Sequence, residues 1–518
     1  TFLTFVRHAI ARASSLIERI LKSHTARWSE LLAGRINENK NMYNTIGMKN
    51  HLPKRMKHVH LVGVKGVAMA SLAVYFRDLG ITVTGSDTGD LFPTDEQLHA
   101  NGVIVYKGFD PKRYAQIVPD LVVYTGAHGG RDNVEVADAV LLGIPVLPHG
   151  QALGEIMEGK RQVVVAGSHG KTTTSAMIAC IFEIAKLQPS YAIGCGAITG
   201  LKASGHRGKG NWFIAEADEY VTDPNHDDTP RFLWMHPEIV VVTNVDFDHP
   251  DVYADLTAVK QAFQKLVAKM DFQIQYLIVN RDDEKSAFLL SNSFVETYGF
   301  SPRADVCITH VSLGDGRQFF TLEKRGIPMG EFMIKVAGRH NVANATAAIV
   351  AAEAAGISLA DIREGLKSFG GTRRRFEYLG EKNGAIVVDD YAHHPTEIQA
   401  TLKAAKEWYK DRRIIAVFQP HTYSRTNMLL CEFSKSFHDA DVVLLTDIYS
   451  SAREKETLGT TGQTLVAETV KHHSNVSYGK TKEDVLKKLD DFTTPNDVII
   501  FMGAGDIYTW GRDYLNAK

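Results

Sequence analysis

A buried strand that runs through a glycine turn into a helix stands near the middle of the chain. Residues 163–174 read Val-Val-Val-Ala-Gly-Ser-His-Gly-Lys-Thr-Thr-Thr. Glycine lets backbone N–H groups approach an anion closely, and the N-terminus of a helix adds a favourable dipole. The turn needs a strand before it and a helix after it, so it predicts an α/β unit whose helix begins near Thr172.

The residue types in this turn favour binding of nucleotide phosphates. Lys171 would neutralise the β- and γ-phosphates, and the Thr172 hydroxyl would reach Mg²⁺. The general motif has glycine five residues before Gly170, whereas this chain has Val165. The turn is therefore a shorter variant of the motif, and a strand–helix turn without a ligand remains the alternative at this point.

Acidic residues follow two further predicted strands of the same α/β unit. Glu-Ala-Asp-Glu at 216–219 ends one strand, and Asp-Phe-Asp-His at 246–249 follows another. Carboxylates and an imidazole beside a phosphate loop can hold a hard cation that bridges phosphates. Each cluster alone fits a solvated loop, but the shared position at the carboxyl ends of strands favours a ligand site.

The first domain offers only part of a dinucleotide-binding motif. Gly63-x-x-Gly66 follows the predicted strand His58–Val62, and Asp87 closes the next strand. A complete G-x-G-x-x-G is absent, which argues against a dehydrogenase. An acidic residue at the end of the second strand commonly meets a ribose hydroxyl, so a nucleotide moiety fits this domain better than NAD.

Histidines gather in the last third of the chain. His393 and His394 are adjacent in a predicted strand end that reads Asp-Asp-Tyr-Ala-His-His-Pro at 389–395, while His421 and Arg425 belong to the end of another predicted strand. Adjacent side chains on a strand point to opposite faces, and no third ligand stands at a familiar zinc spacing, so zinc is disfavoured. Arg425 with a nearby histidine suits capture of a substrate carboxylate.

The bulk composition excludes several other classes of protein. A chain of 518 residues with net charge −2 predicts about three or four domains and no global attraction to nucleic acid. The four scattered cysteines fit a reducing compartment. No apolar run reaches the ~20 residues of a transmembrane helix. Residues 1–55, rich in arginine and lysine, predict a partly disordered extension; a targeting peptide or a membrane-surface helix is the alternative.

Taken in chain order, these motifs resemble those of the Mur ligase family, whose cytosolic members extend the peptide of peptidoglycan precursors. The similar segments are the phosphate loop and residues 216–219, 248–249, 338–345, 389–397, 419–426 and 503–507. The resemblance covers residues 56–518 and implies three successive α/β domains. These are a Rossmann-like UDP-sugar-binding domain at 56–158, a P-loop ATPase domain at 159–370 and a Rossmann-like amino-acid-binding domain at 371–518.

The resemblance also implies roles for individual residues. Those expected to bind ATP are Gly167, Ser168, His169, Gly170, Lys171, Thr172, Thr173, His340 and Asn344. Those expected to bind the UDP-sugar are Gly63, Lys65, Gly66 and Asp87. The expected Mg²⁺ ligands are Thr172, Glu216 and His249, and the residues expected to receive the amino acid are His393, His421 and Arg425. Catalysis is assigned to Lys171, Glu216, His249, Asp390 and Arg425.

The activity implied is ATP-dependent joining of L-alanine to the lactyl carboxylate of UDP-N-acetylmuramate through an acyl phosphate, in a cytoplasmic monomer or weak homodimer. Two features depart from the family pattern: Thr422 stands where some relatives have arginine, and Gln264 where others have a carbamylated lysine. Residues 219–251 resemble the family member that recycles the muropeptide tripeptide, so tripeptide ligation is one alternative. A folate polyglutamylating ligase and a non-catalytic nucleotide-binding regulator are the others.

Overall fold

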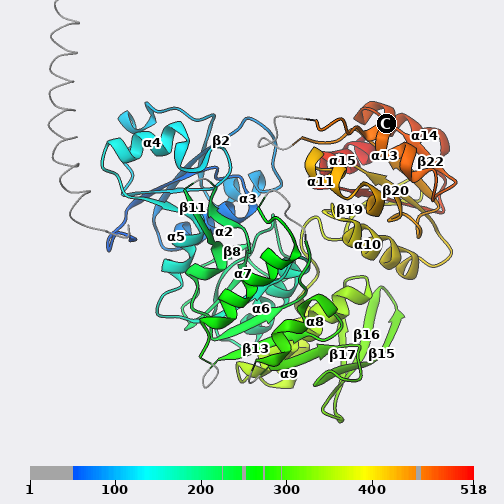
Figure 1. The fold of residues 1–518 in the computed structure, drawn as a ribbon, viewed down its shortest axis with the longest axis horizontal. Coiled ribbons are helices and arrows are strands. Elements are labelled where there is room, and N and C mark those ends of the chain that lie inside the picture. The colour runs from blue at the N-terminus through cyan, green and yellow to red at the C-terminus, as the bar shows by residue number, and fades with distance from the viewer. Residues whose placement is uncertain are drawn as a thin grey trace, which may run out of the picture. The chain divides into compact units, whose positions relative to one another are not determined.

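The computed structural model describes residues 51–517 apart from 225, 248–251, 272–274, 293–294 and 451–456. All but the end of the predicted extension 1–55 therefore lies outside the described residues, and so does its interpretation. In the described part, three larger sheets follow one another along the chain (Figure 1). No helix in that part is both long enough and apolar enough to cross a membrane.

The first sheet is parallel throughout and has the strand order β3-β2-β1-β4-β5. Its strands are β1 His58–Val62, β2 Thr82–Asp87, β3 Ile104–Lys107, β4 Leu121–Tyr124 and β5 Val146–Pro148. Its helices are α2 Val67–Asp78, α3 Asp95–Ala100, η1 Arg113–Ala115, η2 Gly130–Asp132, α4 Val134–Leu141 and α5 His149–Ile156. The strand order reverses between β1 and β4, so their carboxyl ends form the crevice where open α/β sheets bind ligands.

The central sheet has ten strands in the order β17-β16-β15-β14-β13-β12-β6-β9-β7-β8. The strands are β6 Arg161–Ala166, β7 Ser190–Ala192, β8 Gly205–His206, β9 Trp212–Ala217, β12 Ile239–Val242, β13 Tyr276–Asn280, β14 Val295–Gly299, β15 Val306–Gly314, β16 Arg317–Lys324 and β17 Ile327–Ile334. The helices are α6 Lys171–Ile184, η3 Arg231–Trp234, α7 Leu256–Ala268, η4 Glu284–Ser291, α8 Arg339–Ala354 and α9 Leu359–Ser368. A separate antiparallel pair, β10 Val221–Asp223 and β11 Asp227–Pro230, follows β9.

The antiparallel strands β15, β16 and β17 were not predicted from the sequence. They alternate buried and exposed side chains instead of forming continuous apolar runs, because one face of this part of the sheet is solvated. Two-residue turns join them, with positive φ at Asp315-Gly316 and Arg325-Gly326, as tight hairpins require. In Figure 1 α8 and α9 lie beside these strands.

The third sheet has the order β18-β19-β23-β20-β21-β22, with only β18 antiparallel to its neighbour. Its strands are β18 Glu377–Lys382, β19 Ala385–Asp390, β20 Arg413–Phe418, β21 Val442–Leu445, β22 Val476–Tyr478 and β23 Asp497–Met502. Its helices are α10 Pro395–Trp408, α11 Tyr423–Met428, α12 Leu430–Ser434, α13 Gly462–Thr469, α14 Lys482–Phe492 and α15 Ile507–Asn516.

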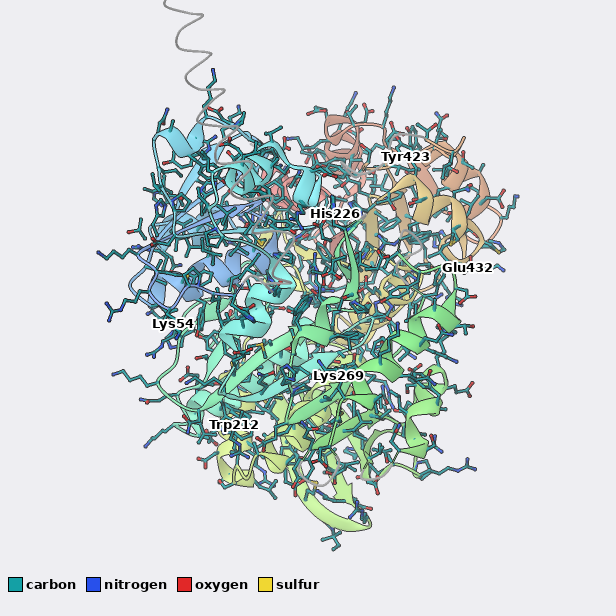
Figure 2. All side chains as sticks on the ribbon, turned by 60° about the vertical axis from the view of Figure 1, so that its left-hand side comes forward. Lys54, Trp212, His226, Lys269, Tyr423 and Glu432 are labelled. Atoms are coloured by element: carbon teal, nitrogen blue, oxygen red, sulfur yellow. The ribbon has the colours of Figure 1, made fainter. Side chains whose placement is uncertain are left out.

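Burial on both faces explains why the parallel strands were recognisable from sequence. Val163–Ala166 in β6 and Ile239–Val242 in β12 have no exposed surface, because helices cover both sides of the sheet. Side chains fill the space between these helices and the strands (Figure 2). The predicted fold class, three successive α/β domains, is therefore confirmed; the boundaries at 56–158, 159–370 and 371–518 stay predictions.

Candidate functional site

The phosphate loop connects β6 to α6, as the sequence predicts. Gly167 has φ +134°, and a Cβ there would meet the Thr243 side chain and lie 2.9 Å from the Asn244 carbonyl oxygen. Gly170 has φ +83° and lies against Asn344, whose Oδ1 would be 2.6 Å from an added Cβ. Only glycine satisfies both the backbone angle and the close approach at these positions. The helix begins at Lys171.

Residues that follow β12 hold the loop in place. His169 N donates to Asn244 Oδ1 at 2.9 Å, and Thr243 Oγ1 donates to the His169 carbonyl at 2.6 Å. Asp246 N donates to Ser168 Oγ at 2.7 Å. The first N–H with an acceptor inside the helix is that of Thr174, which bonds Gly170 O at 3.0 Å. The N–H groups of residues 171–173 are thus the ones that a helix start leaves for an anion.

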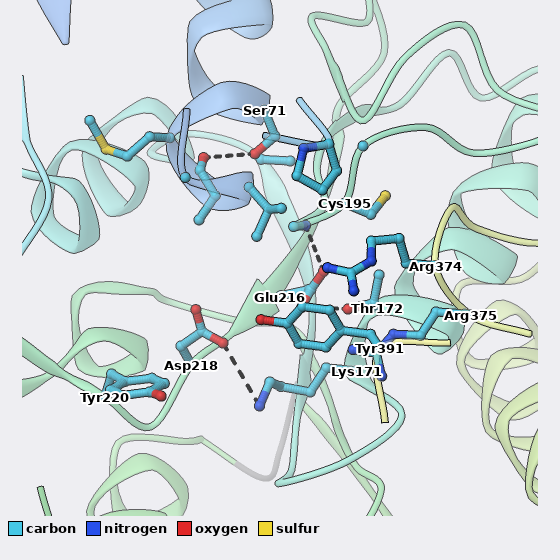
Figure 3. A pocket seen from close by; sticks show the side chains of 18 of the residues that line it. Ser71, Lys171, Thr172, Cys195, Glu216, Asp218, Tyr220, Arg374, Arg375 and Tyr391 are labelled. Atoms are coloured by element: carbon cyan, nitrogen blue, oxygen red, sulfur yellow. Dashed lines mark hydrogen bonds and ion pairs between the residues drawn. The ribbon is translucent and has the colours of Figure 1, made fainter. Parts of the chain in front are cut away.

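The Lys171 ammonium lies among carboxylates at the start of α6. Its Nζ donates to Gly167 O at 2.6 Å and lies 3.2 Å from Glu219 Oε2 and 3.8 Å from Asp218 Oδ1. Figure 3 shows Lys171 and Asp218 joined in this way. Burial by itself lowers the pKa of Lys171, but the negative charges of Glu219 and Asp218 outweigh burial and raise that pKa above its usual value. The side chain therefore carries a fixed positive charge.

Thr172 and Glu216 offer a pair of oxygen ligands beside that charge. Thr172 Oγ1 donates to Glu216 Oε2 at 3.1 Å, and Gly194 N donates to Glu216 Oε1 at 2.6 Å (Figure 3). Burial, and then the charge of Asp218, raises the pKa of Glu216 to about 7. Such a carboxylate still lacks a full counter-charge, and a hydroxyl with a carboxylate is a donor set that suits Mg²⁺. The third predicted ligand, His249, lies outside the described residues.

Residues of the third sheet reach the phosphate loop through Glu397 in α10. Glu397 Oε1 lies 3.1 Å from His169 Nδ1 and 3.7 Å from Arg375 Nη1, and Glu397 Oε2 accepts the His393 N–H at 3.0 Å. Burial alone raises the pKa of Glu397, but the His393 and His169 imidazoles outweigh burial and hold that pKa well below its usual value. A negative charge, 12% exposed, is thus held where the two domains meet.

Asp390 lies at the end of β19, and the adjacent residues His393 and His394 lie just beyond it. Asp390 is buried, and both its carboxylate oxygens accept backbone N–H groups, from Phe376 at 2.7 Å and from Ala392 at 2.7 Å. Its carboxylate therefore shapes the loop. His393 and His394 lie beyond the strand, not on it, so the argument from opposite strand faces was wrong; His394 caps α10 through Nδ1, which accepts Thr396 N at 3.4 Å.

A carboxylate and two imidazoles also converge at the phosphate loop. Ligand atoms of His169, Asp246 and His394 lie within 4.8 Å of one another. Lys285 Nζ is already 2.6 Å from Asp246 Oδ1 and supplies a cation to this group. The lysine and the ring contact between the histidines, with centroids 5.1 Å apart, make the cluster an ion-paired junction between domains.

His421 and Arg425 lie at the carboxyl end of β20. Thr422, with φ +69°, caps α11 through its side chain, which accepts Arg425 N at 3.3 Å. The His421 ring packs against Tyr449 with centroids 6.0 Å apart and meets His393 edge-on at 6.4 Å. Arg425 is buried. The predicted amino-acid residues are thus brought near one another by β19 and β20, which both flank β23.

The predicted UDP residues lie at the crevice of the first sheet. Lys65 N donates to Asp87 Oδ2 at 2.7 Å, which ties the turn after β1 to the end of β2. Lys65 Nζ donates to Asp90 O at 2.7 Å and pairs with Asp95 at 3.1 Å. Gly63 has φ +81°, and an added Cβ would collide with Thr125 at the end of β4. Gly66 immediately precedes α2 and leaves the crevice open beside that helix.

The predicted adenine residues belong to the start of α8. Asn344 Nδ2 donates to Asn341 Oδ1 at 3.1 Å, and the Asn344 amide faces Gly170 of the phosphate loop. His340, one turn earlier, is exposed. Thr173 is buried in the first turn of α6. The start of α8 therefore stands beside the start of α6, although 167 to 174 and 340 to 344 are far apart in sequence.

A cavity of about 350 Å³ is lined by residues of the first domain, the phosphate loop and the third domain. Of the predicted residues it is lined by Gly66, Ser168, His169, Gly170, Lys171, Thr172, Glu216 and His393. His421, Arg425, Asp390, His340 and Asn344 are not among its lining residues. The cavity therefore unites the expected ATP, metal and amino-acid regions only in part.

Sequence reasoning missed several lining residues, which are His149, Asp218, Tyr220, Arg231, Arg375, Tyr391 and Glu397. Asp218 and Glu397 lie in the motifs 216–219 and 389–397, but a motif does not show where a side chain points. His149 opens α5 without any motif; burial, and then Arg231, lowers its pKa to about 4. Arg375 and Tyr391 face the loop from the third domain in Figure 3.

Comparison with known proteins gives matches along nearly the whole described chain. Three family models match in order: "Mur ligase family, catalytic domain" at 58–161, "Mur ligase middle domain" at 165–352 and "Mur ligase, glutamate ligase domain" at 374–505. A UDP-N-acetylmuramate–L-alanine ligase of Desulfitobacterium hafniense is 38% identical over 88% of this chain and 99% of its own. The same-named enzyme of Acetivibrio thermocellus is 40% identical over 90% and 97%.

Solved structures agree with these matches. The crystal structure of UDP-N-acetylmuramate–alanine ligase from Thermotoga maritima has a TM-score of 0.75 at 26% identity, covering 89% of this chain and 99% of that chain. A murein peptide ligase from Psychrobacter arcticus has a TM-score of 0.66 at 25% identity, covering 89% and 98%. Both similarities span all three sheets of the described structure.

Proposed function

The chain belongs to the Mur ligase family, and from this premise we propose how its site works. The chain is an ATP-dependent ligase that joins L-alanine to the lactyl carboxylate of UDP-N-acetylmuramate. The observation that carries this function is the 38–40% identity to L-alanine ligases over 88–90% of the chain. The reaction would take place in the cavity that the phosphate loop and the third domain both line.

The phosphate loop would bind the triphosphate of ATP. Helix N–H groups at 171–173 and the Lys171 ammonium supply positive charge where phosphoryl transfer needs it most. Lys171 is paired with Glu219 and Asp218, and phosphate oxygens would replace these partners. Ser168, His169 and the two glycines of the loop shape its backbone.

Thr172 and Glu216 are the described residues that would hold Mg²⁺, with His249 proposed as a further ligand from the sequence. The ion, when bound, supplies neutralisation of phosphate charge. The Glu216 carboxyl group has a pKa of about 7, and a nearby positive charge would lower that pKa and favour its ionised form. His340 and Asn344 at the start of α8 are proposed to contact the adenine, because Asn344 already lies against Gly170.

The acceptor and donor would approach from the other two domains. The crevice at Gly63, Lys65, Gly66 and Asp87 is proposed to bind the UDP moiety. His393, His421 and Arg425 are proposed to receive L-alanine, with the guanidinium of Arg425 facing its carboxylate. Since His421 and Arg425 lie outside the cavity, we propose that the third domain closes further when substrates bind.

The decisive experiment is a phosphate-release assay with UDP-N-acetylmuramate, ATP and Mg²⁺. One arm adds L-alanine, one adds the tripeptide L-alanyl-γ-D-glutamyl-meso-diaminopimelate, and one adds neither. Release that depends on L-alanine is the expected result. Release with the tripeptide alone would transfer the chain to the recycling activity, and no release in any arm would favour a nucleotide-binding regulator.

The state and location of the protein complete the proposal. We propose a cytoplasmic monomer or weak homodimer, since its substrates are small molecules and precursor synthesis consumes ATP. Sedimentation at micromolar concentration, with and without UDP-N-acetylmuramate, measures the oligomeric state directly.

A further inference from the structure

We infer that His393, oriented by Glu397, is the base that removes a proton from the incoming ammonium group. The inference rests on the proposed ligase function and assigns a step that the function leaves open. An ammonium nitrogen has no lone pair, so the amino acid must lose a proton before it can attack an acyl phosphate. The structure contains a histidine whose hydrogen bonds prepare one ring nitrogen for that role.

The tautomer of His393 follows from its neighbours. His393 Nδ1 lies 3.0 Å from the carbonyl oxygen of Tyr391 and 3.2 Å from Glu397 Oε2. A carbonyl oxygen and a carboxylate can only accept hydrogen bonds, so Nδ1 must carry the proton. In the neutral ring, Nε2 then has the lone pair. The nitrogen on the far side of the ring from Glu397 is therefore the proton acceptor.

Glu397 is held as a carboxylate by the groups around it. It accepts the backbone N–H of His393 at 3.0 Å, and its other oxygen lies 3.1 Å from His169 Nδ1 and 3.7 Å from Arg375. These donors and cations favour the ionised form. A negative charge beside Nδ1, largely shielded from solvent, stabilises the imidazolium that forms when Nε2 takes a proton. Glu397 is thus a positioning residue, and it acts through His393.

Both side chains line the cavity that contains Lys171, so His393 faces the place where the acyl phosphate would form. The other candidate bases are engaged elsewhere. Both carboxylate oxygens of Asp390 accept hydrogen bonds from backbone N–H groups, those of Phe376 and Ala392. His394 caps α10 through Nδ1.

Two more imidazoles face this region, from the phosphate loop and from the end of β20. His169 contacts Glu397 on one side and Asp246, at 3.7 Å, on the other. His421 packs on Tyr449 and meets His393 edge-on, outside the cavity lining. Arg375, Asp390 and His340 also interact electrostatically with Glu397, and the Tyr391 ring meets His393 edge-on with centroids 5.1 Å apart. His169 also lines the cavity and turns Nδ1 to Glu397, but its Nε2 lies 3.7 Å from Asp246 Oδ2. We therefore assign the role of base to His393.

His393 Nε2 takes one proton from the ammonium group and becomes imidazolium. The amine nitrogen then forms a bond to the acyl carbon, and the bond from that carbon to the phosphate oxygen breaks. The phosphate leaves with the electron pair and takes up the second proton that the nitrogen loses as the amide forms. The imidazolium returns its proton to water.

A nucleophile that needs no base separates this role from binding. Hydroxylamine is largely unprotonated at neutral pH and traps the acyl phosphate as a hydroxamate. We expect His393→Gln to lower L-alanine ligation at saturating L-alanine by at least about 100-fold, the usual contribution of a general base, while hydroxamate formation stays within about threefold of wild type. Glu397→Gln should lower L-alanine ligation about tenfold and also leave hydroxamate formation near the wild-type rate. Glu407→Gln, the same change on the same helix, should alter neither reaction.

The pH dependence gives a second readout. Ligation by His393→Gln should rise about tenfold per pH unit toward the pKa of the L-alanine ammonium group, because solution then supplies the free amine. Equal losses of ligation and hydroxamate, or a loss that saturating L-alanine restores, would overturn the inference. Absence of hydroxamate and of ligation in wild type would instead refute the ligase function, so the two failures are distinguishable.

Discussion

Replacing Gly167 by alanine tests whether the loop backbone is the rigid element that binds ATP. The native φ of +134° is essentially reserved for glycine, and an added Cβ would meet the Thr243 side chain and lie 2.9 Å from Asn244 O. A residue held in that backbone region costs about 1–3 kcal/mol. The close contacts with the Asn244 carbonyl and the buried Thr243 side chain add about 1 kcal/mol or more, because one of these groups must move.

Together these two terms raise the free energy of the phosphate-binding loop conformation by about 2–4 kcal/mol. At 1.4 kcal/mol per tenfold, kcat/KM for ATP should fall by about 30-fold to about 700-fold. Phosphate release at varied ATP, with L-alanine and UDP-N-acetylmuramate saturating, measures this ratio. Thermal unfolding of the same variant reports how much of the cost is borne by the fold.

Gly159→Ala is the matched control. Gly159 also has positive φ, +72°, but an added Cβ meets nothing within 4 Å. This variant should lose about 1 kcal/mol of stability and retain its kcat/KM for ATP. If Gly167→Ala has kcat/KM within twofold of wild type, the loop is not held as the structure describes and the reasoning fails.

Three further predictions concern charged residues. Lys171→Ala should lower turnover at saturating ATP by at least about 100-fold in the phosphate-release assay, while circular dichroism shows a folded protein. Arg425→Ala should raise the KM for L-alanine by at least about tenfold and leave hydroxamate formation unchanged. Burial raises the pKa of Glu135, but hydrogen bonds from His60, Asp110 and Arg113 outweigh burial and lower that pKa to about 2. Its charge therefore adds ~3 kcal/mol to the free energy of unfolding above about pH 5, and this stabilisation is lost as the pH falls toward 2. Glu135→Gln should lose the same free energy of unfolding at pH 7, measured by chemical denaturation. An unchanged denaturation midpoint would contradict this prediction.

The parallel strands and the phosphate loop were predictable because their signals are local. β1 begins and ends at the predicted residues, His58 and Val62, since strands buried on both faces leave continuous apolar runs. The antiparallel strands β15–β17 escaped prediction because one face is solvated and their apolar residues alternate. The Asp315-Gly316 turn was the signal that a closer search for hairpins could have used.

The candidate site divides in the same way. The family motifs gave Lys171, Thr172, Glu216 and His393 their places, and the cavity lining includes all four. The motifs also contained Asp390, but not the fact that backbone N–H groups take up both its oxygens. The residue type shows which groups can donate or accept hydrogen bonds. Which partners they bond depends on where neighbouring segments lie in the fold.

The sequence by itself determined the phosphate loop of this protein, because strand, turn and helix are set by dihedral preferences and hydrogen bonds within a few residues. Only the tertiary structure decided the charge and proton states at the site. His169 and Glu397 meet across 228 residues of chain, and Lys171 meets Glu219 across 48. Ionisation depends on burial and on nearby charge, and both are created when distant segments pack together.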